Sequence, residues 1–198
     1  MEDDIFEYIV EDIEDITLEE IDCDLDEDEI NMIFTRNFLI NPTLWTDSEE
    51  INRHINIDAM HEVKYVRDDL IQYDSDLNSL PTNGGLYFFF IKPPILFGKI
   101  QYLVYIGRAR GTDSQNLKKR CREYFYDFRN VNKDDSRTRK VRRMIKRWGK
   151  YLYLQYIEIS DNNLIDSLES LLINNIRPPF NSSIPEKKYY QPAVAAFQ

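Results

Sequence analysis

The sequence predicts an α+β domain in which helices pack against a small sheet. Three runs rich in aromatic and β-branched residues have the composition of strands. Three other segments carry apolar residues at helical spacing. These elements follow one another in the order β-β-α-α-β-α, which is typical of a small sheet with helices on it.

The strand predictions rest on composition and on the residues that end each run. Residues 86–91 read Leu-Tyr-Phe-Phe-Phe-Ile, which predicts a buried strand that ends at Pro93-Pro94. Residues 101–106 predict a second strand closed by Gly107, and antiparallel pairing is the simplest arrangement for the two. Residues 151–159 predict the third strand.

The helix predictions rest on apolar stripes. Residues 115–128, 137–148 and 162–176 each place their large apolar side chains on one helical face. Pro178-Pro179 ends the last of these helices. A looser pattern over residues 59–72 predicts one more helix, and turn residues near Leu80 then mark the start of the domain.

The net charge of −10 conceals two oppositely charged parts of the chain. Residues 1–80 hold 25 acidic and 4 basic side chains, whereas residues 81–198 hold 10 acidic and 21 basic ones. We therefore divide the chain into an acidic extension (1–80), a basic domain (81–183) and a short tail (184–198). Such asymmetry indicates an electrostatic partner for each half.

The first 30 residues contain 16 acids and no Lys or Arg, with apolar residues at helical spacing. Two interpretations stay open for this acidic arm. It is either a segment without stable structure or a helix that docks on a basic surface. That surface would belong to the basic half of the same chain or to a partner protein.

Several classes of protein are excluded by composition. Two cysteines and two histidines provide neither a disulfide framework nor a Cys/His zinc site. No apolar run approaches the ~20 residues that a membrane span requires, and the acidic N-terminus does not resemble a signal peptide. We expect an intracellular protein, cytoplasmic in a bacterial or phage setting, that is neither secreted nor bound to a membrane.

The predicted helix over residues 137–148 and its flank carry eight basic side chains and no acid. Because the apolar stripe faces inward, these basic side chains face solvent, and one sign repeated in this way favours nucleic-acid binding over plain solvation. The predicted DNA-binding residues are Arg137, Arg139, Lys140, Arg142, Arg143, Lys146, Arg147 and Lys150.

Glu169 and Arg120 occupy unusual positions on their predicted helices. Most helical neighbours of Glu169 are apolar, so it is either a rim carboxylate that reaches solvent or a buried one matched by a metal ion or an arginine. Arg120 lies beside an apolar stripe, so it is either a surface residue with a packed stem or a guanidinium aimed at a phosphate.

Taken together, these residues resemble the motifs of the GIY-YIG nuclease family. The resemblance covers about residues 83–183 and is closest to the nuclease domain of the bacterial excision-repair incision protein. Two loop insertions, at 93–99 and 111–114, separate the matched motifs. The motifs in chain order are Gly85-Leu86-Tyr87, Tyr105-Ile106-Gly107 followed by Arg108, Asn116 to Arg120 followed by Tyr124-Phe125, Leu168-Glu169-Ser170-Leu171-Leu172-Ile173, and Pro179-Phe180-Asn181.

The resemblance implies a three-stranded antiparallel sheet flanked by helices, and hydrolysis of DNA phosphodiesters with one divalent metal ion. That metal is Mg²⁺, or another divalent cation such as Mn²⁺. The resemblance also implies a role for each matched residue. Glu169 would ligate the metal, and Arg120 would stabilise charge at the phosphate. Tyr87 or Tyr105 would activate the attacking water, with Tyr87 preferred, and Arg108 would supply the positive charge that a tyrosine base needs. Tyr124 would position the phosphate or pack, and Asn181 would hold the glutamate helix in place.

We therefore expect a stand-alone, metal-dependent DNA endonuclease of restriction, phage, viral or mobile-element type. Double-strand cutting with one active site per chain would call for a homodimer. The alternative is a catalytically silent nucleic-acid-binding module regulated by its acidic arm, because inactive relatives of enzymes exist.

Overall fold

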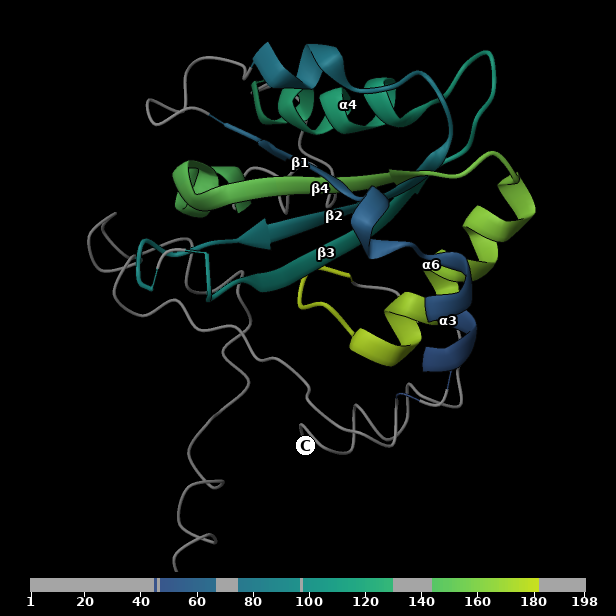
Figure 1. Ribbon diagram of the computed structural model, residues 1–198. Coiled ribbons are helices and arrows are strands. Elements are labelled where there is room, and N and C mark those ends of the chain that lie inside the picture. The colour runs from purple at the N-terminus through teal and green to yellow at the C-terminus, as the bar shows by residue number, and fades with distance from the viewer. Residues whose placement is uncertain (1–44, 46, 67–74, 97, 130–143, 182–198) are drawn as a thin grey trace, which may run out of the picture. The chain divides into compact units, whose positions relative to one another are not determined.

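A computed structural model describes residues 45, 47–66, 75–96, 98–129 and 144–181 (Figure 1). The chain divides into two units, and every described residue belongs to the second, Asn37–Gln198. The acidic arm of residues 1–30 and the tail of residues 184–198 lie outside the described residues, so the predictions for them stay predictions.

The described residues form an α+β structure around one four-stranded antiparallel sheet. Its strands are β1 (His61–Lys64), β2 (Gly85–Ile91), β3 (Tyr102–Ala109) and β4 (Leu152–Glu158). They lie in the order β1-β4-β2-β3, so β2 is central and β3 is an outer strand. The predicted antiparallel pairing of the two aromatic strands is confirmed, with Gly85 opposite Ala109 and Ile91 opposite Tyr102.

Two expectations for the N-terminal half need correction. The sheet has four strands rather than three, and residues 61–64 form a strand where a helix was predicted. The four-residue β1 pairs with β4, about ninety positions later in the chain, so its partner contributes the hydrogen bonds that its own sequence does not announce. A boundary at residue 80 therefore separates β1 from the sheet to which it belongs.

The described residues include the α-helices α3 (Ser48–His54), α4 (Leu117–Arg129) and α6 (Asn162–Ile176). Short 3₁₀ helices cover Ile57–Ala59, Ser75–Ser79 and Gly149–Tyr151. The predicted helix over 162–176 is confirmed, and residues 144–148 are helical within the predicted basic helix. Residues 130–143 lie outside the described part of the chain.

Both faces of the sheet are covered, which gives three layers (Figure 1). Alternation along β2 sets this up, because successive side chains of a strand point to opposite faces. Tyr87 and Phe89 pack in the core beneath α4, whereas Leu86 and Phe88 pack in the core that α6 and α3 complete. In the described residues, no helix is long and apolar enough to cross a membrane.

Candidate active site

Three tyrosine hydroxyl groups meet between the sheet and α4. Tyr87 comes from β2, Tyr105 from β3 and Tyr124 from α4. The Tyr87 and Tyr124 hydroxyl oxygens lie 2.7 Å apart, and the Tyr124 hydroxyl donates to Tyr105 over 3.1 Å. Tyr87 is fully buried and Tyr124 nearly so, while Tyr105 is only partly buried. The three residues therefore form a hydrogen-bonded chain that reaches the surface at Tyr105.

Gly107 makes room for this arrangement. A Cβ atom at position 107 would lie 2.4 Å from both the Cζ and the hydroxyl oxygen of Tyr87. No side chain fits between the β3 backbone and the Tyr87 ring, so only glycine allows so close an approach. The two glycine-tyrosine motifs of the sequence, Gly85-Leu86-Tyr87 and Tyr105-Ile106-Gly107, are therefore in direct contact, because Gly107 of the second leaves room for the Tyr87 ring of the first.

Burial raises the pKa of both inner tyrosines well above the ordinary value of 10. Repulsion from the other tyrosines adds to the effect, and the positive charge of Arg120 opposes it. Tyr87 and Tyr124 therefore keep their protons at neutral pH.

Arg120 projects from α4 toward this tyrosine cluster. Its guanidinium carbon lies 5.5 Å from the centre of the Tyr124 ring, and its Nη1 donates to Oε2 of Glu123 over 2.9 Å. Burial works against the charge of Arg120, but its interactions with Tyr87, Tyr124 and Glu123 outweigh that cost and raise the pKa. The residue is thus a permanently charged, half-buried cation.

The start of α4 fixes the position of Arg120. The Asn116 side chain accepts a hydrogen bond from the Lys119 amide over 2.8 Å, which caps the helix, and the Arg120 amide bonds to the Asn116 carbonyl. The Leu117 amide donates to the carbonyl of Asn83, two residues before β2. The helix is therefore tied directly to the start of the strand that carries Tyr87.

Glu169 lies on α6 and forms an ion pair with Arg108 of β3. Arg108 Nη1 lies 2.7 Å from Glu169 Oε2. Only 17% of the Glu169 side chain is exposed, and burial raises its pKa although Arg108 and Arg120 act to lower it. The sequence left open whether this carboxylate is buried or at the rim, and the structure places it mostly buried beside an arginine.

Asp166, which the sequence analysis did not single out, joins the same network. Its Oδ1 lies 3.1 Å from Nε of Arg108, and its carboxylate forms a two-point ion pair with Arg110. The hydrogen bond from Arg110 lowers the pKa of Asp166, with a further contribution from Arg108. The signal in the sequence is its position three residues before Glu169 on the same helix, together with Arg108 at the end of β3 and Arg110 just after it.

Asn181 binds the backbone of β3 between two of the motif residues. Its side-chain Oδ1 accepts from the Ile106 amide over 2.9 Å, and its Nδ2 donates to the Ile106 carbonyl over 2.8 Å. The Phe180 amide donates to the Val104 carbonyl. Asn181 therefore fixes the end of the segment that follows α6 directly against the strand that carries Tyr105 and Arg108.

The end of α6 directs the chain toward these contacts. Arg177 adopts the left-handed conformation with φ of 52° and caps the helix, and Pro178 follows it. The Asn181 amide then bonds back to the Pro178 carbonyl. This turn brings Asn181 from the end of the glutamate helix to the middle of β3.

Glu169 is the described carboxylate that could hold a metal ion at this site. Among the described residues, no group of three His, Cys, Asp or Glu side chains converges. Glu169 offers one carboxylate, and Mg²⁺ commonly binds through one or two carboxylates while it keeps several waters. In the structure this carboxylate is paired with the Arg108 guanidinium.

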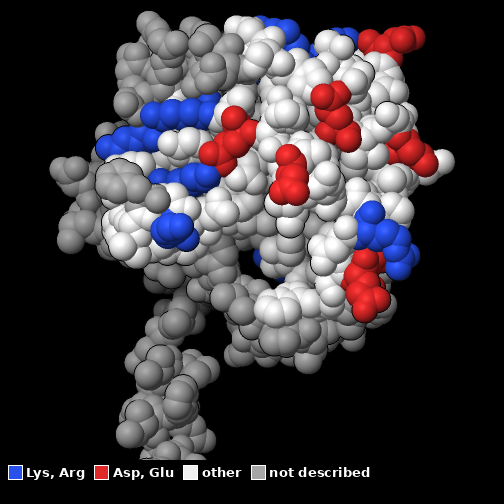
Figure 2. Space-filling model, viewed as in Figure 1, with Lys and Arg blue, Asp and Glu red and all other residues white. Residues whose placement is uncertain are grey.

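The predicted DNA-binding residues are only partly described. Lys146 and Lys150 are exposed in the segment that precedes β4, and Arg147 is partly buried. On the face drawn in Figure 2, basic side chains gather near that end of the sheet, and acidic ones lie across the middle. The other five predicted residues, Arg137, Arg139, Lys140, Arg142 and Arg143, lie outside the described residues.

The predicted site residues fall into two groups on either side of β3. Tyr87, Tyr105, Tyr124 and Arg120 form one, and Arg108 with Glu169 forms the other. Arg120 links them, because its charge acts on both the tyrosines and Glu169. The sequence matches no protein-family model, and comparison with curated proteins and solved structures finds no match either.

Proposed function

We propose that this protein is a metal-dependent endonuclease of GIY-YIG type that hydrolyses DNA phosphodiester bonds. The observation that carries the proposal is the position of Arg120, whose guanidinium carbon lies 5.5 Å from the centre of the Tyr124 ring, beside the three hydrogen-bonded tyrosine hydroxyl groups. A phosphodiester near this guanidinium would have a water-binding hydroxyl on one side and a carboxylate for a metal ion on the other.

In this proposal the side chains divide the work by exposure and charge. Arg120 binds a phosphate oxygen and stabilises the negative charge that grows in the transition state. Tyr105, the partly exposed tyrosine, orients the attacking water. Tyr87, too deeply buried to reach solvent, acts through Tyr124, which donates to the Tyr105 oxygen and fixes its orientation. This refines the sequence-based preference for Tyr87 as the group that contacts water.

Glu169 is the residue that would hold Mg²⁺ or Mn²⁺. When bound there, the ion supplies positive charge that stabilises the leaving oxygen. Arg108 has to share or release Glu169 to admit the ion, and its second contact with Asp166 lets it remain nearby. Asn181 keeps the α6 end of the site aligned with β3 through its two bonds to Ile106.

Cleavage of supercoiled plasmid with Mg²⁺ tests the proposal. We expect Glu169→Gln and Tyr105→Phe to abolish nicking and linearisation. Glu62→Gln is the matched control, because Glu62 is an exposed carboxylate on β1 that pairs with Lys92, and it should cut like the wild type. Equal cutting by Glu169→Gln and wild type would rule out this active site.

A catalytically silent DNA-binding module remains the second candidate. It is favoured by the raised pKa of the buried Tyr87 and by the Arg108 guanidinium on Glu169. Salt-sensitive DNA binding without cutting in Mg²⁺ or Mn²⁺ would select this function. Cutting that depends on Glu169 would eliminate it.

The charge division of the sequence supports a regulatory role for the acidic extension. The net charge of −21 on residues 1–80 is opposite in sign to the net charge of +11 on residues 81–198. In this proposal the arm covers the DNA-binding surface until DNA or a basic partner displaces it. Deletion of residues 1–34 should then tighten DNA binding, most strongly at low salt. If the full chain and the deletion variant have the same dissociation constant for DNA at every salt concentration, the arm does not cover the DNA-binding surface.

A further inference from the structure

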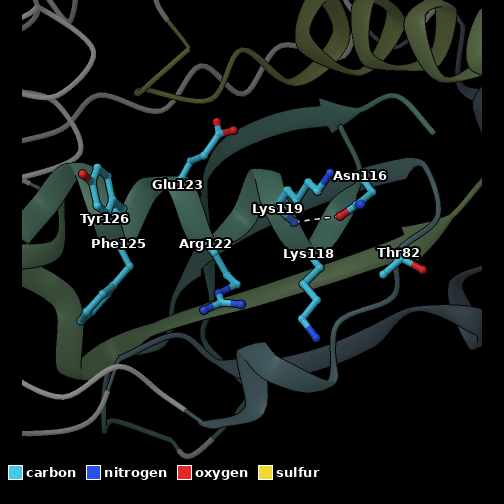
Figure 3. Close-up of a pocket in the computed structure, with 8 residues that line it drawn as sticks. All are labelled: Thr82, Asn116, Lys118, Lys119, Arg122, Glu123, Phe125 and Tyr126. Atoms are coloured by element: carbon cyan, nitrogen blue, oxygen red, sulfur yellow. Dashed lines mark hydrogen bonds between the residues drawn. The ribbon is translucent and has the colours of Figure 1, made fainter. Parts of the chain in front are cut away.

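A groove with a volume of about 790 Å³ is lined mainly by residues of α4. Figure 3 shows its lining side chains along the helix, with Lys118 and Arg122 directed to the same side. It begins near Thr82 and the cap residue Asn116 and ends at Tyr126. The lining is completed by Lys119, Glu123 and Phe125.

The charge of this groove is predominantly positive. Lys118 and Lys119 donate to the backbone carbonyls of Asn78 and Asp113, which carry no charge. Arg122 is exposed and adds a third cation. The lone carboxylate of the lining, Glu123, is held by Arg120. A polyanion is therefore the complementary occupant.

Tyr126 gives the groove a second property. Its side chain is 68% exposed, although burial of such a ring would normally be favourable. It follows Arg122 by four residues, so the two side chains are neighbours on the helix surface. Cations beside an exposed aromatic ring are the combination that binds single-stranded nucleic acid, because a base can stack only when it is outside a duplex.

We propose that this α4 groove binds a single strand of DNA. Lys118, Lys119 and Arg122 contact phosphates of the strand, and a base stacks on the Tyr126 ring. From residue 118 to residue 126 the helix rises about 12 Å, so the cations and the ring lie along one short stretch of the helix. The proposal rests on the proposed function, since it assigns an unpaired strand to the substrate of the same enzyme.

Glu123 connects the groove to the candidate active site. Its side chain lines the groove, and its carboxylate accepts from Arg120, which faces the tyrosines. Glu123 therefore lies between the groove and Arg120, the arginine that is proposed to bind the phosphate. This relation favours substrates with an unpaired segment next to the bond that is cut.

Binding is measured with the full chain in EDTA, by fluorescence anisotropy on a labelled 12-nucleotide oligothymidine and on a duplex of equal length. EDTA removes cleavage from the measurement, so failure of the nuclease proposal and failure of the groove proposal are separate results. The variants are Tyr126→Ala and Arg122→Ala. Their matched controls are Tyr102→Ala, an exposed tyrosine of β3, and Lys99→Ala, an exposed cation of the β2–β3 loop.

We expect tighter binding of the single strand than of the duplex. Tyr126→Ala should weaken it about tenfold, since stacking contributes on this scale, while Tyr102→Ala leaves it unchanged. Arg122→Ala should reduce the slope of log K against log salt by about 0.7, the value for one phosphate of a single strand. Preference for the duplex, or equal losses in Tyr126→Ala and Tyr102→Ala, would overturn the proposal.

Discussion

Replacement of Gly107 by alanine tests whether the contact between the two glycine-tyrosine motifs holds the site together. The new Cβ would lie 2.4 Å from both Cζ and the hydroxyl oxygen of Tyr87, far inside ordinary contact distance. Tyr87 cannot retreat, because it is fully buried between Phe89, Tyr105 and Tyr124. The strand or the ring has to move, and overpacking of this kind costs about 1–3 kcal/mol.

For a chain of this size the cost corresponds to a decrease of roughly 2–12 °C in the midpoint of thermal unfolding. Calorimetry of Gly107→Ala measures the decrease directly. A double-mutant cycle with Tyr87→Leu isolates the cause, because the three nearest atoms to the new Cβ all belong to Tyr87. In the Tyr87→Leu background, Gly107→Ala should cost little. An equal cost in both backgrounds would refute the reasoning.

Three further predictions concern the hydrogen bonds and charges of the site. Asn181→Ala should lower the free energy of unfolding by about 1–3 kcal/mol in urea titrations, because both polar groups of Ile106 lose their partner. Glu169→Gln should raise the unfolding temperature at pH 7 in EDTA, since burial raises the pKa of this carboxyl group and its ionised form destabilises the fold; the gain should vanish below the ordinary carboxyl pKa of about 4.3. Tyr124→Phe should reduce the loss of stability above pH 10. Because the pKa of Tyr124 is raised in the folded chain, the unfolded chain releases this proton at lower pH. The protonated Tyr124 therefore stabilises the fold fully below pH 10, and this contribution is lost as the pH rises above 10.

The sequence predicted elements with strong local signals and missed those that depend on distant pairing. The α6 pattern ends at two prolines, and its predicted limits agree with the structure. Strand β1 has four residues, two of them charged, and only its pairing with β4 makes it a strand. The strand order likewise depends on contacts between residues far apart in the chain, which periodicity does not encode.

The candidate site divides in the same way. Motif order predicted which residues gather near β3, but it did not predict their partners. The resemblance implied that Arg108 supplies charge to a tyrosine, whereas in the structure it pairs with Glu169 and Asp166. Arg120 is instead the positive charge that acts on Tyr87. Which of two arginines faces a given hydroxyl depends on strand alternation and helix rotation, and these are fixed only when the layers pack.

The contacts of Asn181 also decide how this sheet can associate with other molecules. Strand β3 has an open side, and unpaired backbone groups on such a side recruit further strands. Here the Val104 carbonyl and both polar groups of Ile106 are already occupied, by Phe180 and Asn181. A second copy therefore cannot extend the sheet at β3 without first removing Asn181. The residue implied to support cleavage also protects the strand against edge-to-edge aggregation.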